Sequence, residues 1–132
     1  MNYLVVGCGR LGAELAYSMS QKGHEITVID NHVDSFRNLD PDFRGRTVIG
    51  EATDEDVLHR AKIETADGVA VVTNSDSLNI VIAHIARTVY QIPAIIVRNY
   101  DPKLRPLYDT FGFQVVSSTG WGSQRIEELL SH

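Results

Sequence analysis

The sequence predicts an α/β protein with a Rossmann-type, doubly wound sheet of six mainly parallel strands and helices on both faces. Two observations predict this fold class. Short β-branched runs alternate with helical patterns along all 132 residues, which is typical of successive βαβ units. The runs, such as VAVV and AIIV, are almost continuously apolar, as expected of strands that helices cover on both sides. A chain of this length suits one compact domain, which we expect to span residues 1–132.

Six apolar runs are the predicted strands of this sheet. Each is short and rich in β-branched residues, and helical patterns separate most consecutive runs. No internal repeat or low-complexity linker interrupts them, so a single domain accounts for the whole chain. The predicted strands are Tyr3–Val6, Glu25–Ile29, Arg46–Ile49, Gly68–Val72, Ala94–Val97 and Gln114–Val116.

Apolar residues at a spacing of four predict the first helix. Gly23 follows them as a stop signal, and the stripe that we expect to be buried is Leu11, Leu15 and Met19. A second helix is predicted to follow a cap formed by Thr53 and Asp56.

The later helices are predicted by the same signals. The pattern over Asn79–Tyr90 is too apolar for one buried face, so we expect burial on more than one side, within the fold or in an oligomer. Asp101 followed by Pro102 is a typical helix start, and the residues expected to face inward after it are Leu104, Leu107 and Phe111. A last helix is predicted over Gly120–Leu130, where Trp121 either anchors a partner surface or packs on its own domain.

Three glycines form a GxGxxG motif between the first strand and the first helix. Gly7 permits a tight turn, Gly9 leaves room for phosphates, and Gly12 lets helix and strand approach closely. The amides of the first helical turn then face the anion. We therefore expect the ligand's phosphates to contact the whole loop, which consists of Gly7, Cys8, Gly9, Arg10, Leu11 and Gly12.

An acidic residue ends the second predicted strand at the spacing that the glycine motif requires. The carboxylate of Asp30 can accept two hydrogen bonds from ribose hydroxyls, and its charge would repel a 2′-phosphate. The sequence therefore favours NAD(H) or an adenosine phosphate (ATP, ADP or AMP) over NADP(H).

Composition excludes several other classes of function. A net charge of −5 argues against nucleic acid as a partner. The lack of a bilayer-spanning run or a signal segment predicts a cytoplasmic protein. The five histidines and Cys8 do not occur at zinc-ligand spacing, so we expect no metal site. Cys8 is interpreted as a small residue that fills the tight turn.

Five motifs resemble, in order and spacing, the RCK or TrkA-N family of nucleotide-binding domains that regulate potassium channels and transporters. They are GCGRLG, VID, GEATDEDVL, VVTNSDSLN and VRNYDP, and together they extend over almost the entire chain. The resemblance implies a Rossmann-type sheet, binding of NAD(H) or ATP/ADP, and dimers or rings that change shape with the nucleotide. Many relatives continue into a second, C-terminal RCK lobe, and we expect none in this chain.

The resemblance also implies roles for individual residues. Asp30, with Asn31 beside it, would meet the ribose. Further positions would line the rest of the nucleotide: Glu51 and Ala52 near the adenosine, Thr73 and Asn74 at the side of the cleft, and Arg98 near the phosphates. Asp109 takes the place of a cation-binding glutamate in some relatives, although an exposed carboxylate without a ligand is the favoured interpretation.

Arg10 carries the hypothesis of a sensor. A guanidinium buried in a glycine loop can bind phosphate oxygens bidentately, within the subunit or across an interface. Such contacts would make Arg10 a sensor of phosphate number. The alternative is a solvated arginine at the edge of the loop.

No catalytic constellation accompanies the nucleotide loop, so we expect a regulator rather than an enzyme. A dehydrogenase needs an acid or base held over the nicotinamide, usually by a second domain. The hypothesis is a cytoplasmic nucleotide-sensing subunit, a homodimer or higher ring, that gates a membrane potassium channel or transporter from the inner face. The alternatives are a small NAD-dependent oxidoreductase completed by a partner chain, a regulator of a proton-coupled cation antiporter, and a nucleotide-binding scaffold without a switch.

Overall fold

The computed structural model describes residues 1–131, and the side chains of residues 118–121, Trp121 among them, lie outside the described ones. Six strands form one sheet in the order β3-β2-β1-β4-β5-β6, and every pairing is parallel. The expected fold class is confirmed, and each predicted strand is present with at most one residue added or lost at an end. The strands are β1 Asn2–Val6, β2 Glu25–Asp30, β3 Arg46–Ile49, β4 Gly68–Val71, β5 Ala94–Arg98 and β6 Gln114–Val116.

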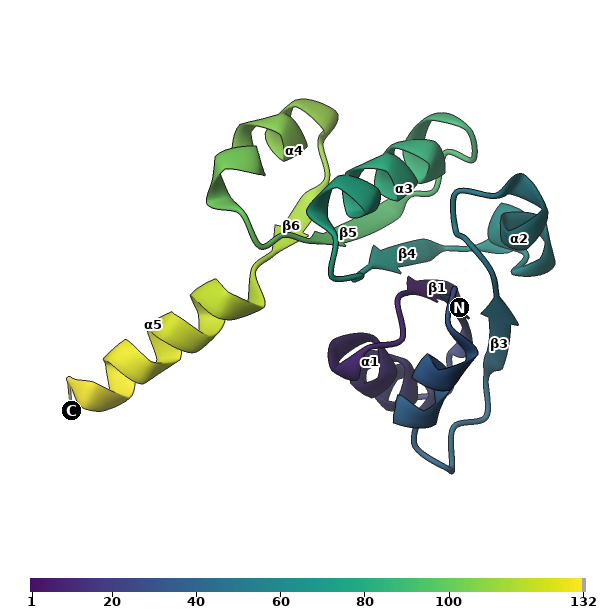
Figure 1. Ribbon diagram of the computed structural model, residues 1–132, viewed down its shortest axis with the longest axis horizontal. Helices are drawn as coiled ribbons and strands as arrows, with labels where there is room; N and C mark the ends of the chain where they lie inside the picture. The colour runs from purple at the N-terminus through teal and green to yellow at the C-terminus, as the bar shows by residue number, and fades with distance from the viewer. Residues whose placement is uncertain (132) are drawn as a thin grey trace.

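Helices cover both faces of the sheet (Figure 1). On one face, α1 (Arg10–Gln21) and the short 3-10 helix η1 (Val33–Asn38) enclose an apolar core with Val5 and Val28 of the strands. On the other face the core contains the neighbouring strand residues Leu4 and Ile29 together with three helices, namely α2 (Glu55–Arg60), α3 (Asp76–Thr88) and α4 (Arg105–Phe111). Side chains that alternate along the strands therefore supply two separate cores.

The strand order reverses between β1 and β4. The chain runs outward from β1 through β2 to β3, then returns to pair β4 with the other edge of β1. The helices on either side of such a reversal leave a crevice at the carboxyl ends of the strands. In this chain the glycine loop follows β1 directly and so lies at that crevice.

Several details of the helices differ from the sequence-based expectations. The stripe Leu11, Leu15 and Met19 is only half-buried, because the small residues Ala13 and Ala16 bring α1 close to the sheet and make the fully buried contact. Asp54 rather than Thr53 caps α2, since its carboxylate accepts a hydrogen bond from the backbone N–H of Asp56.

The helices of the second face also differ. The side chain of Ser75 caps α3, so this helix begins three residues before the predicted Asn79. Val81 on the outward side of α3 and Val89 just after its end remain exposed, so within this chain α3 is buried on one side. In α4 the fully buried residue is Tyr108, whereas Leu107 is exposed.

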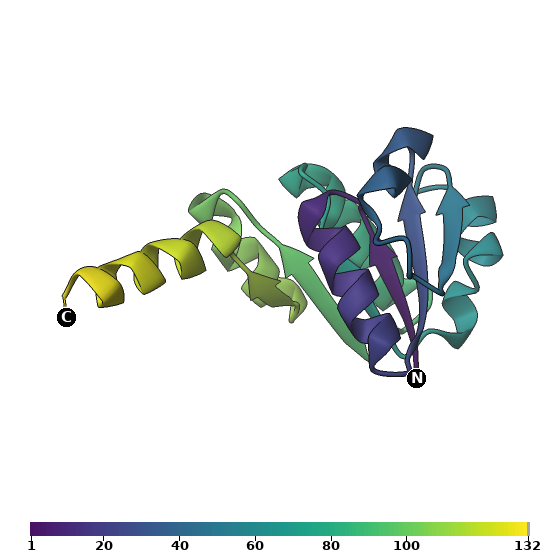
Figure 2. The ribbon, with the colours of Figure 1, turned by 90° about the horizontal axis from the view of Figure 1, so that it is seen from below.

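The last helix, α5 (Ser118–Leu130), leaves the sheet after β6 and projects away from the rest of the domain (Figures 1 and 2). Its apolar side chains Ile126, Leu129 and Leu130 are exposed. Within residues 1–131, no helix has the length and apolar character needed to cross a membrane.

Candidate functional site

A groove of about 290 Å³ lies at the carboxyl ends of β1 to β5 and brings most of the predicted site residues together. The predicted residues that line it are Gly7, Gly9, Asp30, Asn31, Glu51, Ala52, Thr73, Asn74 and Arg98. The groove also contains positions that the sequence did not single out, among them Ser35, Gly50, Leu78 and Ile82.

The glycines have distinct roles in shaping this groove. Gly7 has φ 106°, and a Cβ there would lie 3.0 Å from the backbone nitrogen of Thr73. A Cβ on Gly12 would lie 1.8 Å from the carbonyl oxygen of Gly7, so only glycine allows α1 to begin this close to the loop. A Cβ on Gly9 would meet nothing within 4 Å, because Gly9 faces the open groove. The first and third glycines therefore build the loop, and the second leaves space beside it.

Four predicted loop residues do not line the groove. Cys8 and Gly12 are buried beneath it, and Leu11 is half-buried on α1. Burial, followed by the charge of Asp30, raises the pKa of the Cys8 thiol to about 11, so this thiol stays protonated and unreactive at neutral pH.

For the fourth of these residues, Arg10, the sequence left two interpretations open, a guanidinium buried in the loop and a solvated arginine at its edge. The structure has the second, because Arg10 is the first residue of α1 and its side chain is exposed. Within the described residues it forms no hydrogen bond or ion pair.

Asp30 connects the end of β2 to the glycine loop. Its Oδ2 accepts a hydrogen bond from the backbone N–H of Cys8 at 2.8 Å, and its Oδ1 accepts one from the N–H of His32, also at 2.8 Å. The side chain is only 13% exposed, so these amides hold the carboxylate in one orientation. Each oxygen keeps a further lone pair that can accept from a ribose hydroxyl.

Asn31 and Glu51 connect the ends of β2 and β3 at one side of the groove. The Nδ2 of Asn31 donates a hydrogen bond to Oε1 of Glu51 at 2.8 Å, and both side chains are exposed. Ala52, next to Glu51, is buried and lines the groove with an apolar surface. This side of the groove thus offers hydrogen-bond acceptors and an apolar surface, as an adenosine would require.

The opposite side is formed by the loops after β4 and β5. Thr73 and Asn74 come from the first loop, and Arg98 ends β5 with its guanidinium 4.5 Å from the centre of the Tyr100 ring. The groove is therefore acidic at the β2 and β3 ends and basic at the β5 end. Such a division suits a ligand with hydroxyls at one end and phosphates toward the middle.

Asn79 is a contributor to this side that the sequence analysis missed as a site residue. It is a fully buried side chain of α3 and forms hydrogen bonds with both Thr73 and Arg98. The available signal was an amide side chain in an otherwise apolar helix pattern, since a buried polar group is normally hydrogen-bonded to something specific.

The described residues contain no group of three or more His, Cys, Asp or Glu that could hold a metal ion. Asp109 is exposed on α4 and lies 3.9 Å from Arg105 as an i,i+4 ion pair.

A larger groove, of about 480 Å³, lies at the amino ends of β1 to β3, among Tyr3, His24, Arg44, Arg46 and Lys62. None of the predicted nucleotide-binding residues lies in it. Size alone would favour this groove, but the glycine loop and Asp30 place the candidate site at the carboxyl ends.

Comparisons with known proteins agree with this geometry. The model of the TrkA-N domain family matches residues 3–119. The Trk system potassium uptake protein TrkA of Streptomyces coelicolor is 37% identical over 131 residues, which are 98% of this chain and 59% of that protein. The chain thus spans less than two thirds of the length of this relative.

Solved structures extend the comparison. The GsuK channel bound to NAD matches with a TM-score of 0.84 and 27% identity, over 99% of this chain and 23% of that chain. GsuK bound to ADP matches with a TM-score of 0.83 and 27% identity, over 99% of this chain and 34% of that chain. With a Rossmann-type sheet, a glycine loop at its switch point and a family match over most of its length, this chain belongs to the TrkA-N domain family.

Proposed function

We propose that this chain is a nucleotide-sensing regulatory domain of a potassium-transport system, which binds NAD(H) or an adenosine phosphate and gates a channel or transporter. The observation that carries the proposal is the convergence of Gly9, Asp30 and Arg98 on one groove. The GsuK structures with NAD and with ADP support both kinds of ligand. The names of the curated relatives support potassium transport.

Asp30 supports NAD(H) over NADP(H). Its carboxylate already holds two backbone amides, so it is fixed at the position where a ribose would be recognised. A 2′-phosphate there would bring like charges together in a partly buried site, which is unfavourable. The nucleotide preference of the proposed sensor therefore follows from one oriented carboxylate.

A regulatory role fits the groove better than an oxidoreductase role. The groove histidine, His32, neighbours Asp30 and so lies beside the ribose end rather than the end where a nicotinamide would react. At the opposite end, the lining side chains of Thr73, Asn74 and Arg98 are not among the usual general acids and bases. If this chain were instead an oxidoreductase, a partner chain would have to supply the groups that donate and accept protons at the nicotinamide.

The proposed partner is a membrane potassium channel or transporter subunit, met at the cytoplasmic face by a homodimer or larger ring. The exposed apolar side chains of α5, Ile126, Leu129 and Leu130, support association through surface outside the nucleotide groove. If the bound nucleotide stabilises one assembly of the subunits relative to another, that difference in free energy can shift the partner between its open and closed states. A regulator of a proton-coupled antiporter would use the same groove and differ only in the partner.

The substitution Gly9→Ala tests ligand binding without disturbing the fold. Because a Cβ at Gly9 meets no atom within 4 Å and φ is −75°, we expect stability to change by less than about 1 kcal/mol. The added methyl group would occupy the space of the phosphates, so the increase in melting temperature caused by NADH or ADP should be largely lost. Thermal unfolding against NAD, NADH, ATP, ADP, AMP and NADP measures this directly.

Gly122→Ala is the matched control. A Cβ added at Gly122 also meets no atom within 4 Å, and Gly122 lies on α5, away from the groove. Nucleotides should stabilise this variant as they stabilise the wild type. Wild-type protein that no nucleotide stabilises, or that NADP stabilises as well as NAD, would contradict the proposal. Consumption of NADH with added carbonyl substrates would favour the oxidoreductase.

A further inference from the structure

We propose that Asn79 is a positioning residue for the nucleotide groove, and that it sets the affinity for ligands that extend past the ribose, such as NAD(H), but not for AMP. This inference rests on the proposed function and adds to it the residue that shapes one half of the site. Asn79 does not itself line the groove.

The buried amide of Asn79 joins two groove-lining segments. Its Oδ1 accepts hydrogen bonds from the backbone N–H of Thr73 at 3.2 Å and from the Thr73 hydroxyl. Its Nδ2 donates to the carbonyl oxygen of Thr73 at 3.1 Å and to that of Arg98 at 3.0 Å. One side chain on α3 therefore holds the loop after β4 against the end of β5.

These four contacts use the whole hydrogen-bonding capacity of an amide side chain, which has two donors and two acceptor lone pairs. An aspartate could keep the two acceptor contacts but would place a negative charge against two carbonyl oxygens. An aliphatic residue would remove all four of these hydrogen bonds from a partly buried region, which is costly. The site therefore requires an asparagine at residue 79.

Thr73 lies between Asn79 on one side and the glycine loop on the other. Its backbone nitrogen lies only 3.0 Å from the place that a Cβ on Gly7 would occupy, so the glycine loop packs directly against it. A second set of hydrogen bonds also holds α3 against the segment after β5. Asp76 in the first turn of α3 accepts hydrogen bonds from the N–H groups of Tyr100 and Asp101 at 2.8 and 2.9 Å. The first turn of α3 thus holds the segments that border one half of the groove.

The two halves of the groove depend on Asn79 to different degrees. The half formed by Asp30, Asn31 and Ala52 is built on β2 and β3, whereas the side-chain hydrogen bonds of Asn79 go to Thr73 and Arg98. A ligand with one phosphate fits this half and the glycine loop. A dinucleotide must continue past the switch point, where Thr73 and Arg98 are the lining residues that Asn79 positions.

The test measures dissociation constants of NADH and AMP for the wild type, Asn79→Asp and Asn79→Ala by titration calorimetry. We expect NADH to bind both variants about tenfold more weakly or worse. AMP should lose less than about threefold, because Thr73 and Arg98 lie on the half that only the longer ligand reaches, whereas the glycine loop is also held from β2 by hydrogen bonds from Gly7 N–H to the Ile29 carbonyl and from Cys8 N–H to Asp30. The ratio of the two constants is the decisive quantity, since a general loss of stability would not change it.

Val69→Ala is the matched control: it removes a buried side chain of β4 outside the groove, so it should destabilise the fold and leave the ratio unchanged. If the Asn79 variants do not fold, Thr73→Val replaces them. The Thr73 hydroxyl donates a hydrogen bond to Asn79. Its loss weakens the contact between Thr73 and Asn79, so the ratio of the NADH and AMP dissociation constants should shift in the same direction.

The outcomes separate the two proposals. Wild-type protein that binds neither nucleotide overturns the proposed function, and the role of Asn79 with it. Wild-type protein that binds both, with variants that weaken both by the same factor or neither, overturns only the role of Asn79. Wild-type protein that binds AMP but not NADH also overturns it, because no ligand would then use the half of the groove that Asn79 holds.

Discussion

Two grooves lie at opposite ends of the same sheet and differ in how their polar groups are held. At the carboxyl ends, Asp30 and Asn79 form hydrogen bonds of 2.8 to 3.2 Å with backbone amides and carbonyls. At the amino ends, the larger groove is bordered by exposed cations such as Arg44 and Lys62, which form no side-chain hydrogen bond or ion pair with other described residues.

The orientation of its polar groups therefore distinguishes the candidate site better than volume or charge does. A ligand that meets preorganised groups does not lose free energy in ordering them, whereas flexible lysine and arginine side chains must be immobilised on binding. The C-terminal ends of α1 and α2 lie beside the amino-end groove, and the negative end of each helix dipole offsets part of its positive charge. Two of the predictions below compare the two grooves, and a third concerns a surface residue outside both.

The largest effect is expected from Gly12→Ala. The new Cβ would lie 1.8 Å from the carbonyl oxygen of Gly7, a backbone atom that can move only if α1 or the loop shifts. We expect a loss of about 1–3 kcal/mol in the free energy of unfolding, together with loss of nucleotide binding. Urea denaturation with and without NADH measures both.

Gly45→Ala is the corresponding change in the amino-end groove, where the Cβ would lie 2.4 Å from the carbonyl oxygen of Ile26. It should destabilise the protein to a similar degree but keep its stabilisation by NADH. Equal loss of nucleotide binding in both variants would mean that the grooves do not act independently.

A smaller effect, of opposite sign, is expected from Lys62→Gly in the amino-end groove. Lys62 has φ 60° and ψ 45°, a left-handed conformation that costs a non-glycine residue about 1 kcal/mol or more. Glycine removes this conformational strain, but part of the gain in stability is offset because glycine is more flexible in the unfolded chain. We expect the free energy of unfolding to rise by roughly 0.5 kcal/mol, with no change in nucleotide binding.

Gln91→Gly provides the control for Lys62→Gly, because Gln91 has φ 54° and lies outside both grooves. It should stabilise the protein similarly. If Lys62→Gly instead weakened NADH binding, the two ends of the sheet would be coupled. Chemical denaturation and calorimetry on the same samples distinguish these results.

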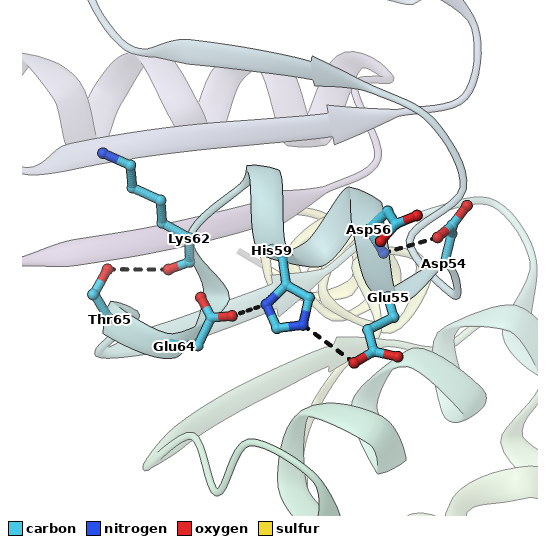
Figure 3. Close-up of polar contacts among 7 residues, drawn as sticks. All are labelled: Asp54, Glu55, Asp56, His59, Lys62, Glu64 and Thr65. Carbon is cyan, nitrogen blue, oxygen red and sulfur yellow. Dashed lines mark hydrogen bonds and ion pairs between the residues drawn. The ribbon is translucent and has the colours of Figure 1, made fainter.

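The smallest effect concerns His59, a surface residue on α2 between two carboxylates (Figure 3). Hydrogen bonds to Glu55 and then Glu64 raise the pKa of His59 above its ordinary value of 6.5. The pKa of Glu64 is lowered, first by a hydrogen bond from its own backbone and further by His59. Protonated His59 is therefore favoured in the folded state.

The sign of the pH dependence follows from these directions. Because the folded pKa of His59 is the higher one, its contribution to stability is fully present below pH 6.5 and lost as pH rises through the folded pKa. It is also lost in acid once Glu64 is protonated. His59→Gln should remove this pH dependence between mildly acidic and neutral pH, in thermal melts at low salt, and high salt should reduce the difference. Nucleotide binding should not respond.

Much of the fold could be predicted from the sequence because its signals are local. Apolar runs specify six strands, and the spacing of Gly7, Gly9 and Gly12 after the first of them specifies the loop at the crevice. The position of Asp30 at the end of β2 is equally local, since it depends only on where that strand stops. The predicted strands are confirmed because their signals do not depend on which distant segments pack against them.

What the sequence left open or missed concerns contacts between segments far apart in the chain. Whether Arg10 faces the groove depends on the rotation of α1 about its axis, which the contact of Ala13 and Ala16 with the sheet decides. The importance of Asn79 depends on α3 lying beside the end of β5, nineteen residues away. Helical periodicity alone gives no information about either contact.

The sequence by itself determined the order of strands and helices, the glycine loop after β1 and the acid at the end of β2, because each rests on backbone conformation and spacing within a few residues. Only the tertiary structure decided which loop residues reach the groove, which side chain holds Thr73 and Arg98 together, and that α5 leaves its apolar residues exposed. The physical reason is that burial and buried hydrogen bonds depend on partners brought together by packing, and one rotated helix exchanges an inward side chain for an outward one.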